Sequence, residues 1–331
     1  MNQRARPIRL PQIVKSKTTI RIECGHFRVS YFTKLAPGSD CLQTLVIPGL
    51  GESYLAFQTF LEQLAKGTES LGFFAVESVK FTSVKAAELR PLWQTRGSLG
   101  SRYIKIKRKV QKTLLEANDQ AIRLLTCDPL EIEAELLVRH LLANGIRRIE
   151  QMVGHSTGAL RALALIEMLN REGYPIKIDR LLLIHPGGLN QELTKWGLTL
   201  NYFWHHALQR RKLTLDEGAK KRQWRSLMET RKILFKGLPS FIFGLKLAKR
   251  LALRRIKEPL ESLLNRGVIQ QLTILHSPAD QIFQAEDFTP PDHPRSQLIE
   301  AEGMSHGQFL LTPKEINQYL QHLEGANRLD W

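Results

Sequence analysis

The sequence has few cysteines and no long apolar run. Its three cysteines are Cys24, Cys41 and Cys127, and they show neither the paired spacing of a disulfide framework nor the spacing of metal ligands. We therefore expect free thiols in a reducing compartment. No apolar run approaches the roughly 20 residues of a membrane-spanning helix. The basic segment 1–17 lacks the apolar stretch of a secretory signal, although an absence of acidic residues before Glu23 is also typical of organellar presequences. These absences favour a cytoplasmic protein that is peripheral to a membrane at most.

Acidic residues are in the minority, and their deficit is concentrated in one region. The chain of 331 residues carries a net charge of +16. Between residues 187 and 267 there are 18 Lys and Arg against 6 Asp and Glu. Such an uneven charge indicates an anionic partner for that region. The hydrophobic content of 43% is enough for a sizeable core, and the sequence contains no internal repeat and no low-complexity segment.

Short apolar runs alternate with amphipathic stretches along most of the chain. Residues 18–33 favour a two-stranded hairpin. The apolar runs predict strands within these segments: 42–49, 72–79, 148–154, 178–188, 270–280 and 296–306. The amphipathic stretches between them predict these helices: 54–67, 129–145, 157–173 and 308–323. The order implies the α/β class, with a mostly parallel central sheet and helices on both faces.

The alternation breaks twice. Residues 80–127 contain Pro91, a Gly/Ser-rich piece and a basic helical pattern. Residues 187–267 contain helical patterns and no convincing strand, and the strand–helix order returns after them. We therefore divide the chain into a basic N-terminal extension, a first part of the core, an inserted helical block and a second part of the core: 1–17, 18–186, 187–267 and 268–331.

A serine between two glycines lies where a predicted strand becomes a predicted helix. Gly154, Ser156 and Gly158 fit the pattern G-x-S-x-G. A serine at a sharp strand-to-helix turn has a strained backbone, and side chains at the two glycine positions would collide with neighbouring elements. The turn raises the hydroxyl above the sheet and leaves the first amides of the helix able to bind an anion. The pattern alone also fits a tight turn without chemistry, since about one chain in ten of this length contains it by chance.

An acid and a histidine follow at the ends of the last two predicted strands. Asp280 comes just after one strand, and His306 follows the next. The chain order is therefore Ser, Asp, His, and all three lie at the carboxyl edge of the sheet, where ligands bind in open α/β sheets. Asp287 and Asp292 are alternative acids that fit the strand end less well.

The turn after the first long strand offers a backbone donor near the same edge. It reads PGLGES over residues 48–53. We expect the Leu50 N–H to be one donor of an oxyanion hole, beside the Thr157 N–H at the start of the helix.

These residues together resemble serine hydrolases of the α/β-hydrolase fold, an esterase-, lipase- and thioesterase-like family with a helical cap. The resemblance spans residues 40–323 and puts the block 187–267 in the position of the family's cap or lid. It rests on four matches: PGLG at 48–51 for the oxyanion turn, GHSTG at 154–158 for the nucleophile elbow, Asp280 in SPADQIF and His306 in GMSHG. The sequence departs from the family pattern at Pro48, where histidine is commoner, and in 80–127, which is longer than usual.

The resemblance implies a serine hydrolase that cleaves a carboxylic ester or thioester with an apolar acyl group. His306 would take the proton of Ser156 as the hydroxyl attacks, and Asp280 would orient the imidazole and stabilise its cation. Water would then release the acyl group, and no cofactor is needed. An acceptor other than water would make the protein an acyltransferase, and an acidic acyl carrier as substrate would make it a thioesterase. A non-catalytic ligand-binding module on the same fold is the alternative of another class.

We give the remaining histidines structural interpretations. His155 is expected to pack beside the serine, and His276 to be structural. His185 is also expected to be structural, although it could line the pocket. His205 and His206 are adjacent and have no ligand partners at metal spacings, so we expect no metal site.

Residues 240–260 combine an apolar and a basic pattern at helical spacing. We assign the apolar face to Phe241, Leu245, Ala248, Ala252 and Ile256, and the basic face to Lys246, Lys249, Arg250, Arg254 and Lys257. The simpler interpretation is a cap helix whose apolar side covers the active site while the basic side faces water. The alternative is contact with an anionic membrane surface or an acidic carrier protein. No recognised nucleic-acid motif accompanies the charge, so we expect no specific nucleic-acid partner.

Overall fold

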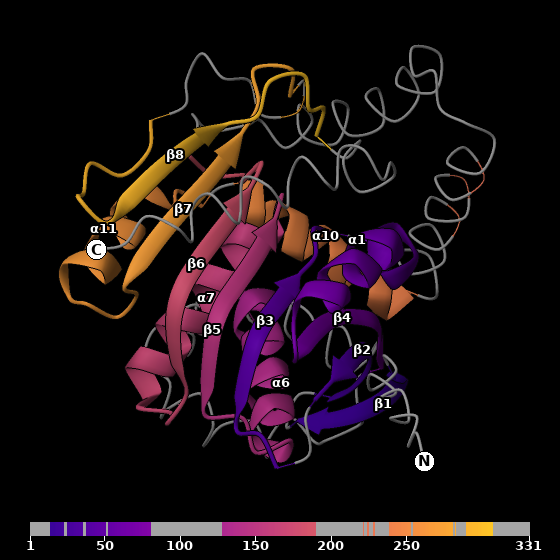
Figure 1. Cartoon of the computed structure of the whole chain (residues 1–331). Coiled ribbons are helices and arrows are strands. Elements are labelled where there is room, and N and C mark those ends of the chain that lie inside the picture. The colour runs from indigo at the N-terminus through magenta and orange to yellow at the C-terminus, as the bar shows by residue number, and fades with distance from the viewer. Residues whose placement is uncertain are drawn as a thin grey trace, which may run out of the picture.

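Parallel strands form the centre of the protein in the computed structural model (Figure 1). The structure describes residues 14–22, 25–35, 38–50, 52–80, 128–189, 238–252, 254–280 and 289–306, with the single residues 221, 224, 228 and 282. Within these ranges eight strands form one sheet of order β1-β2-β4-β3-β5-β6-β7-β8. Their bounds are β1 Val14–Ile22, β2 Gly25–Lys34, β3 Cys41–Ile47, β4 Leu71–Lys80, β5 Arg148–His155, β6 Lys177–Ile184, β7 Gln271–His276 and β8 Ser296–Glu300.

Strand direction separates the N-terminal hairpin from the rest of the sheet. β2 runs antiparallel to β1 and to β4, and every other neighbouring pair of described strands is parallel. The arrowheads of the parallel strands point to the same edge in Figure 1. Both the hairpin over 18–33 and the mostly parallel α/β sheet are therefore confirmed as predicted from the sequence.

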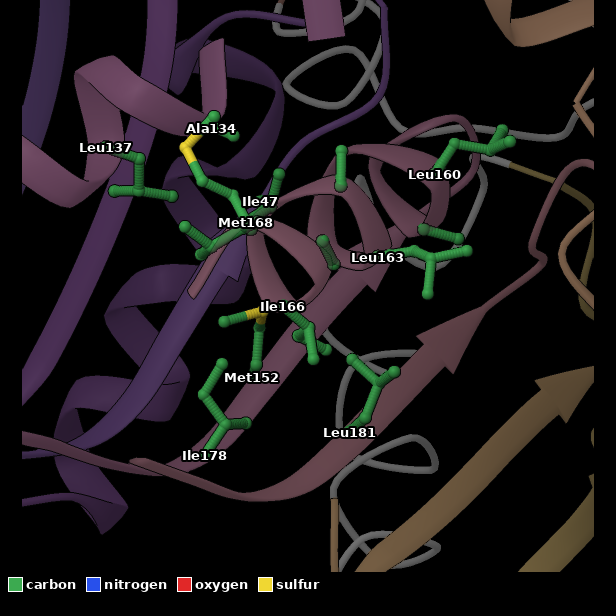
Figure 2. Close-up of a cluster of buried hydrophobic side chains, with 14 of the residues drawn as sticks. Ile47, Ala134, Leu137, Met152, Leu160, Leu163, Ile166, Met168, Ile178 and Leu181 are labelled. Atoms are coloured by element: carbon green, nitrogen blue, oxygen red, sulfur yellow. The ribbon is translucent and has the colours of Figure 1, made fainter. Parts of the chain in front are cut away.

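Helices cover both faces of the sheet. Their bounds are α1 Tyr54–Gly67, α6 Pro129–Ala143, α7 Gly158–Glu172, α10 Leu238–Ala252 and α11 Lys257–Asn265. One cluster of buried hydrophobic side chains joins the last four helices to one face, and a second cluster joins α1 to the other face. Figure 2 shows the first cluster, in which Leu163 and Ile166 of α7 lie over Met152 and Leu181 of the sheet. Because both faces are covered, the central strands are apolar without strict alternation.

Local sequence signals account for the helix ends. The Asp128 carboxylate accepts a hydrogen bond from the Leu130 N–H at 3.0 Å, and Pro129 occupies the first position of α6, where no N–H is needed. At the end of α1 the buried Lys34 ammonium of β2 donates to the carbonyls of Ala65 at 2.7 Å and Thr68 at 2.5 Å. That ammonium satisfies helix-end carbonyls that have no partner within the helix.

The side of helix α10 that faces the core differs in part from the prediction. The buried hydrophobic side chains described in this helix are Phe243, Leu247 and Leu251, whereas Leu245, which we assigned to the apolar face, is 55% exposed. Ile256, assigned to the same face, lies after the helix and is buried. Apolar residues occupy several faces of this helix beside its basic residues, so periodicity does not identify the inward side. Packing decides it, because Phe243 meets Phe27 of β2 edge-on and the helix lies against α6 and β4.

Several basic side chains of this region have acidic partners on the described core. Arg250 pairs with Asp128 at 2.9 Å, and Arg254 pairs with Glu167 of α7. Lys249 is exposed. The basic face is thus partly occupied by two ion pairs, one from α10 to the N-cap of α6 and one from the segment after α10 to α7, rather than wholly solvated.

Some predictions lie outside the described residues. These are the segment 80–127 beyond its first residue, the helix over 308–323, the histidines at 205 and 206, Asp287, and most of the N-terminal extension and of the inserted block. The division into four parts therefore stays a prediction. Of the cysteines, Cys41 is described, and it is a free thiol. In the described ranges no helix is both long and apolar enough to cross a membrane.

Candidate active site

Ser156 lies at the sharp turn between β5 and α7. Its φ is +56°, a left-handed conformation that residues other than glycine rarely adopt. Its N–H donates to the carbonyl of Ile184 at 2.9 Å, which ties the turn to β6. A Cβ on Gly158 would lie 2.3 Å from the carbonyl oxygen of Ile47, and a Cβ on Gly154 would lie 2.9 Å from the backbone of α7. Backbone cannot move aside as a flexible side chain can, so both positions require glycine.

A continuous chain of hydrogen bonds joins Ser156, His306 and Asp280. The Ser156 Oγ lies 2.9 Å from His306 Nε2, and His306 Nδ1 lies 2.8 Å from Asp280 Oδ2. Each residue follows the end of a different parallel strand: Ser156 follows β5, Asp280 follows β7 and His306 follows β8. All three side chains are buried, and Ser156 is 8% exposed. The structure therefore brings together the serine, acid and histidine predicted from the sequence, while the alternative acid Asp292 is exposed.

A second histidine binds the same carboxylate oxygen. His185, after β6, is fully buried, and its Nδ1 lies 3.0 Å from Asp280 Oδ2. The other carboxylate oxygen accepts the Ile282 N–H at 2.8 Å. Burial by itself would raise the pKa of Asp280, but the charge of His306 and the hydrogen bonds from His185 and His306 hold that pKa well below its usual range. Burial lowers the pKa of His185 to about 4, so this histidine is a neutral donor near pH 7.

The histidine before the serine also has specific partners. His155 Nδ1 lies 3.0 Å from Glu52 Oε2, and His155 Nε2 donates to the backbone carbonyl of His306 at 3.0 Å. Burial alone would raise the pKa of Glu52, but the charge and hydrogen bond of His155 and the Gly49 N–H hold it below its usual value. Pairing with Glu52 likewise raises the pKa of His155 against the effect of its own burial. This ion pair links the turn over 48–52 to the loop that carries His306.

The predicted oxyanion donors lie beside the serine. A Cβ built on Gly49 would be 3.2 Å from the Cβ of Ser156, so the turn over 48–52 contacts the serine closely. The Leu50 N–H donates to the Thr157 hydroxyl at 2.6 Å, and this hydroxyl makes no capping bond at the start of α7. The structure thus brings Leu50 and Thr157 together, but the Leu50 N–H has a side-chain acceptor in this state.

A cavity of about 40 Å³ lies behind the same turn. Gly49 and Leu50 form one wall, and Phe243 and Leu247 of α10 form another. Glu52, Glu133 and Arg161 add charged groups to the lining, which also includes residues of β4 and Ser240 and Gly244 of α10. Helix α10 therefore borders the rear of the turn that carries the expected Leu50 donor.

One group of described side chains has the composition of a metal site. Ligand atoms of His185, His276 and Asp280 lie within 4.8 Å of one another. The carboxylate oxygen Oδ2 of Asp280 is, however, already shared by the Nδ1 atoms of His185 and His306. These hydrogen bonds account for the position of the carboxylate without an ion, so we assign no metal to the group.

Sequence reasoning did not identify Glu52, Glu133 and Arg161, and it left the partner of His185 open. The side-chain pairs Glu52–His155, Glu133–Arg161 and His185–Asp280 join residues 103, 28 and 95 positions apart in the chain. The one available signal was charge: acidic or basic residues inside otherwise apolar helices and turns are seldom buried without a partner.

Known proteins that resemble this chain were found by comparison of structures and not by comparison of sequences. No protein-family profile and no curated protein sequence matches the chain. A serine hydrolase from the bacterium Cycloclasticus zankles aligns at a TM-score of 0.52 and 15% identity, over 96% of this chain and all of the other. A carboxylesterase from the thaumarchaeon Nitrososphaera gargenis aligns at 0.50 and 13%, over 93% and 98%. A homoserine O-acetyltransferase from Staphylococcus aureus aligns at 0.54 and 12%, over 97% and 98%. At such identities the likeness establishes a common fold.

Proposed function

We propose that this chain, which has the α/β-hydrolase fold, is a serine hydrolase that cleaves a carboxylic ester or thioester with an apolar acyl group. The observation that carries the proposal is the hydrogen-bonded chain from Ser156 through His306 to Asp280. A serine hydroxyl is a weak nucleophile, and it needs a base within hydrogen-bonding distance and a third group that orients the base. Both distances here lie in the range that such proton transfer requires.

The first half of the reaction forms an acyl-enzyme on Ser156. As Oγ attacks the carbonyl carbon, its proton moves to His306 Nε2, and the electron pair of the C=O bond moves to the oxygen. Asp280 accepts the Nδ1–H of His306, fixes its tautomer and stabilises the imidazolium. The imidazolium then protonates the leaving alcohol or thiol. In the second half, water attacks the acyl group by the same route and restores Ser156.

Backbone donors stabilise the charge on the carbonyl oxygen. The Thr157 N–H lies at the start of α7, where the helix dipole favours an anion. The Leu50 N–H is the second donor, and it must exchange the Thr157 hydroxyl for the substrate oxygen. Each donor of this kind contributes roughly 10²–10³ in rate.

The helical block 187–267 is proposed to select the substrate. Helix α10 borders the rear of the turn that carries Leu50, so the block reaches the edge of the site. Lys249 is exposed on the same helix, and the whole block has a large excess of basic residues. We therefore retain an anionic membrane surface or an acidic carrier protein as its partner, with association that weakens as salt screens the charges.

Acyl transfer to an acceptor other than water is the second candidate. The acyl-enzyme on Ser156 would be common to both reactions, and one of the structural neighbours is an acetyltransferase. Product analysis with and without alcohol or thiol acceptors separates the two. A non-catalytic binding module is disfavoured, since such a module has no need of a base aligned with a serine.

Substitution of Ser156 by alanine tests the proposal. Hydrolysis of short-chain p-nitrophenyl esters should fall to the background rate, while circular dichroism and the unfolding transition stay close to those of the wild type. Ser262→Ala, on the exposed side of α11, is the matched control and should retain full activity. Equal turnover by Ser156→Ala and the wild type, from the same purification, would rule out Ser156 as the nucleophile.

A further inference from the structure

Arg161 is an arginine buried in the helix that follows the serine. It lies on α7 and is 8% exposed, which is unusual for this residue type unless its donors are all engaged. Its Nε donates to Glu133 Oε2 at 2.6 Å, and its Nη2 donates to Glu133 Oε1 at 2.9 Å. Glu133 lies on α6, so this bidentate pair fixes the guanidinium plane between the two helices.

The remaining arm of the guanidinium binds the turn that carries Leu50. Arg161 Nη1 donates to the carbonyl oxygen of Pro48 at 2.7 Å and to that of Gly49 at 3.3 Å. A trans peptide unit is planar, and its N–H points opposite to its C=O. When Arg161 holds the two carbonyls, the N–H groups of Gly49 and Leu50 must therefore point away from it.

The partners of those two N–H groups agree with this orientation. The Gly49 N–H donates to Glu52 Oε2 at 2.6 Å, and the Leu50 N–H donates to the Thr157 hydroxyl at 2.6 Å. Thr157 directly follows Ser156, so the Leu50 N–H is directed to the side of the turn where the nucleophile lies. Arg161, held by Glu133, lies on the carbonyl side of the two peptide units, and both residues line a cavity that Glu52 also borders.

We infer that Arg161, held by Glu133, is a positioning residue that aims the Leu50 N–H at the substrate oxygen. The inference rests on the proposed function, because only an oxyanion gives that orientation a purpose. A buried ion pair by itself contributes little stability over an apolar pair of the same volume, so stability does not explain why the pair is there. The planar guanidinium suits the task, since it bonds a carboxylate with two nitrogens while a third binds carbonyls; an ammonium group cannot reproduce this arrangement.

Two variants test the inference, so that the test still stands if one of them fails to fold. Arg161→Lys keeps the positive charge but cannot bond the Glu133 carboxylate through two nitrogens while a third binds the carbonyls. The double variant Arg161→Met, Glu133→Leu removes both charges together, which leaves no unpaired charge buried. In both variants we expect kcat for ester hydrolysis to fall about 10- to 100-fold, below the roughly 10²–10³ that corresponds to a lost donor, with KM within about 2-fold.

Two further measurements separate positioning from a merely structural role. A trifluoromethyl ketone forms a tetrahedral oxyanion on the serine, and its affinity should fall by the same factor as kcat, whereas a non-reactive ether analogue of the ester should bind as before. Hydrogen exchange of the peptide that contains Gly49 and Leu50 should be about 10-fold faster or more in both variants, because the turn is no longer held.

Arg171 provides the matched control. It lies on the same helix and pairs with Glu131 of α6, but on the exposed side of the two helices. Arg171→Lys should leave kcat, ketone affinity and exchange within about 2-fold of the wild type. Folded Arg161 variants with wild-type kcat and wild-type ketone affinity would overturn the inference. If the wild type itself neither hydrolyses esters nor binds the ketone, the proposed function fails, and unchanged exchange of the turn would then refute the positioning role separately.

Discussion

The Glu52–His155 pair leads to a stability prediction with a characteristic pH dependence. Glu52→Gln preserves the size of the side chain and removes the charge that keeps the proton on His155. The imidazole is fully buried and the Glu52 side chain is 17% exposed, so solvent screens this pair far less than a surface pair. Breaking a buried pair by removing one partner costs about 3–5 kcal/mol, and we expect about 3 kcal/mol because the histidine can release its proton.

The sign of the pH dependence follows from the two pKa shifts. The pKa of Glu52 is lowered from 4.5, so its contribution to stability is present above pH 4.5 and is lost as the pH falls through the folded-state value. The pKa of His155 is raised from 6.5, so its contribution is complete below pH 6.5 and is lost as the pH rises through the folded-state value. The effect of Glu52→Gln is therefore largest between these two values and shrinks in alkaline solution.

Urea unfolding followed by tryptophan fluorescence measures this effect at about pH 5.5 and again at about pH 9.5. Glu62→Gln, on the exposed side of α1, is the control and should change the free energy of unfolding by less than about 0.5 kcal/mol. A Glu52→Gln loss below about 1 kcal/mol near pH 5.5, or one that does not shrink in alkaline solution, would refute the ion pair.

Other substitutions test the site and the fold. Asp280→Asn should lower kcat for ester hydrolysis about 10⁴-fold in steady-state assays without unfolding the chain, because an amide supports the wrong tautomer of His306; a loss under about 10-fold would contradict the role of Asp280. Gly158→Ala should destabilise the protein by about 3 kcal/mol or more in urea unfolding, whereas Gly67→Ala, with no atom within 4 Å of the new Cβ, should change stability by at most about 1 kcal/mol. Lys34→Met should cost about 1.5–3 kcal/mol in the same assay, since it leaves the end carbonyls of α1 without their charged donor; an unchanged midpoint would show that water replaces it.

The strand and helix order could be predicted because each central element carries a local signal. Helix 54–67 was predicted with the bounds that the structure shows, and α6 begins at the predicted residue 129. The meeting of Ser156, Asp280 and His306 could also be expected, since the carboxyl ends of parallel strands lie at one edge of a sheet. Glycine at 154 and 158 indicated a crowded turn, and the distances to neighbouring backbone explain the crowding.

Contacts between distant residues carried no such signal. Glu52 and His155 are 103 positions apart, and His185 and Asp280 are 95 positions apart. No local pattern indicates which buried charge meets which, because the partner depends on how the sheet edge is assembled. Leu245 of α10 was wrongly assigned to the inward face for a related reason: several faces of that helix are apolar, and contact with Phe27 and the surrounding core selects one of them.

Covalent labelling of the serine tests the central claim most directly. The wild type is treated with a fluorophosphonate, and intact mass followed by peptide mapping identifies the modified residue, with Ser156→Ala and His306→Ala treated alongside. We predict a single adduct on Ser156 in the wild type, none in Ser156→Ala, and a much slower reaction in His306→Ala. A folded wild-type protein that forms no adduct, or one that is modified at a different serine, would contradict the account.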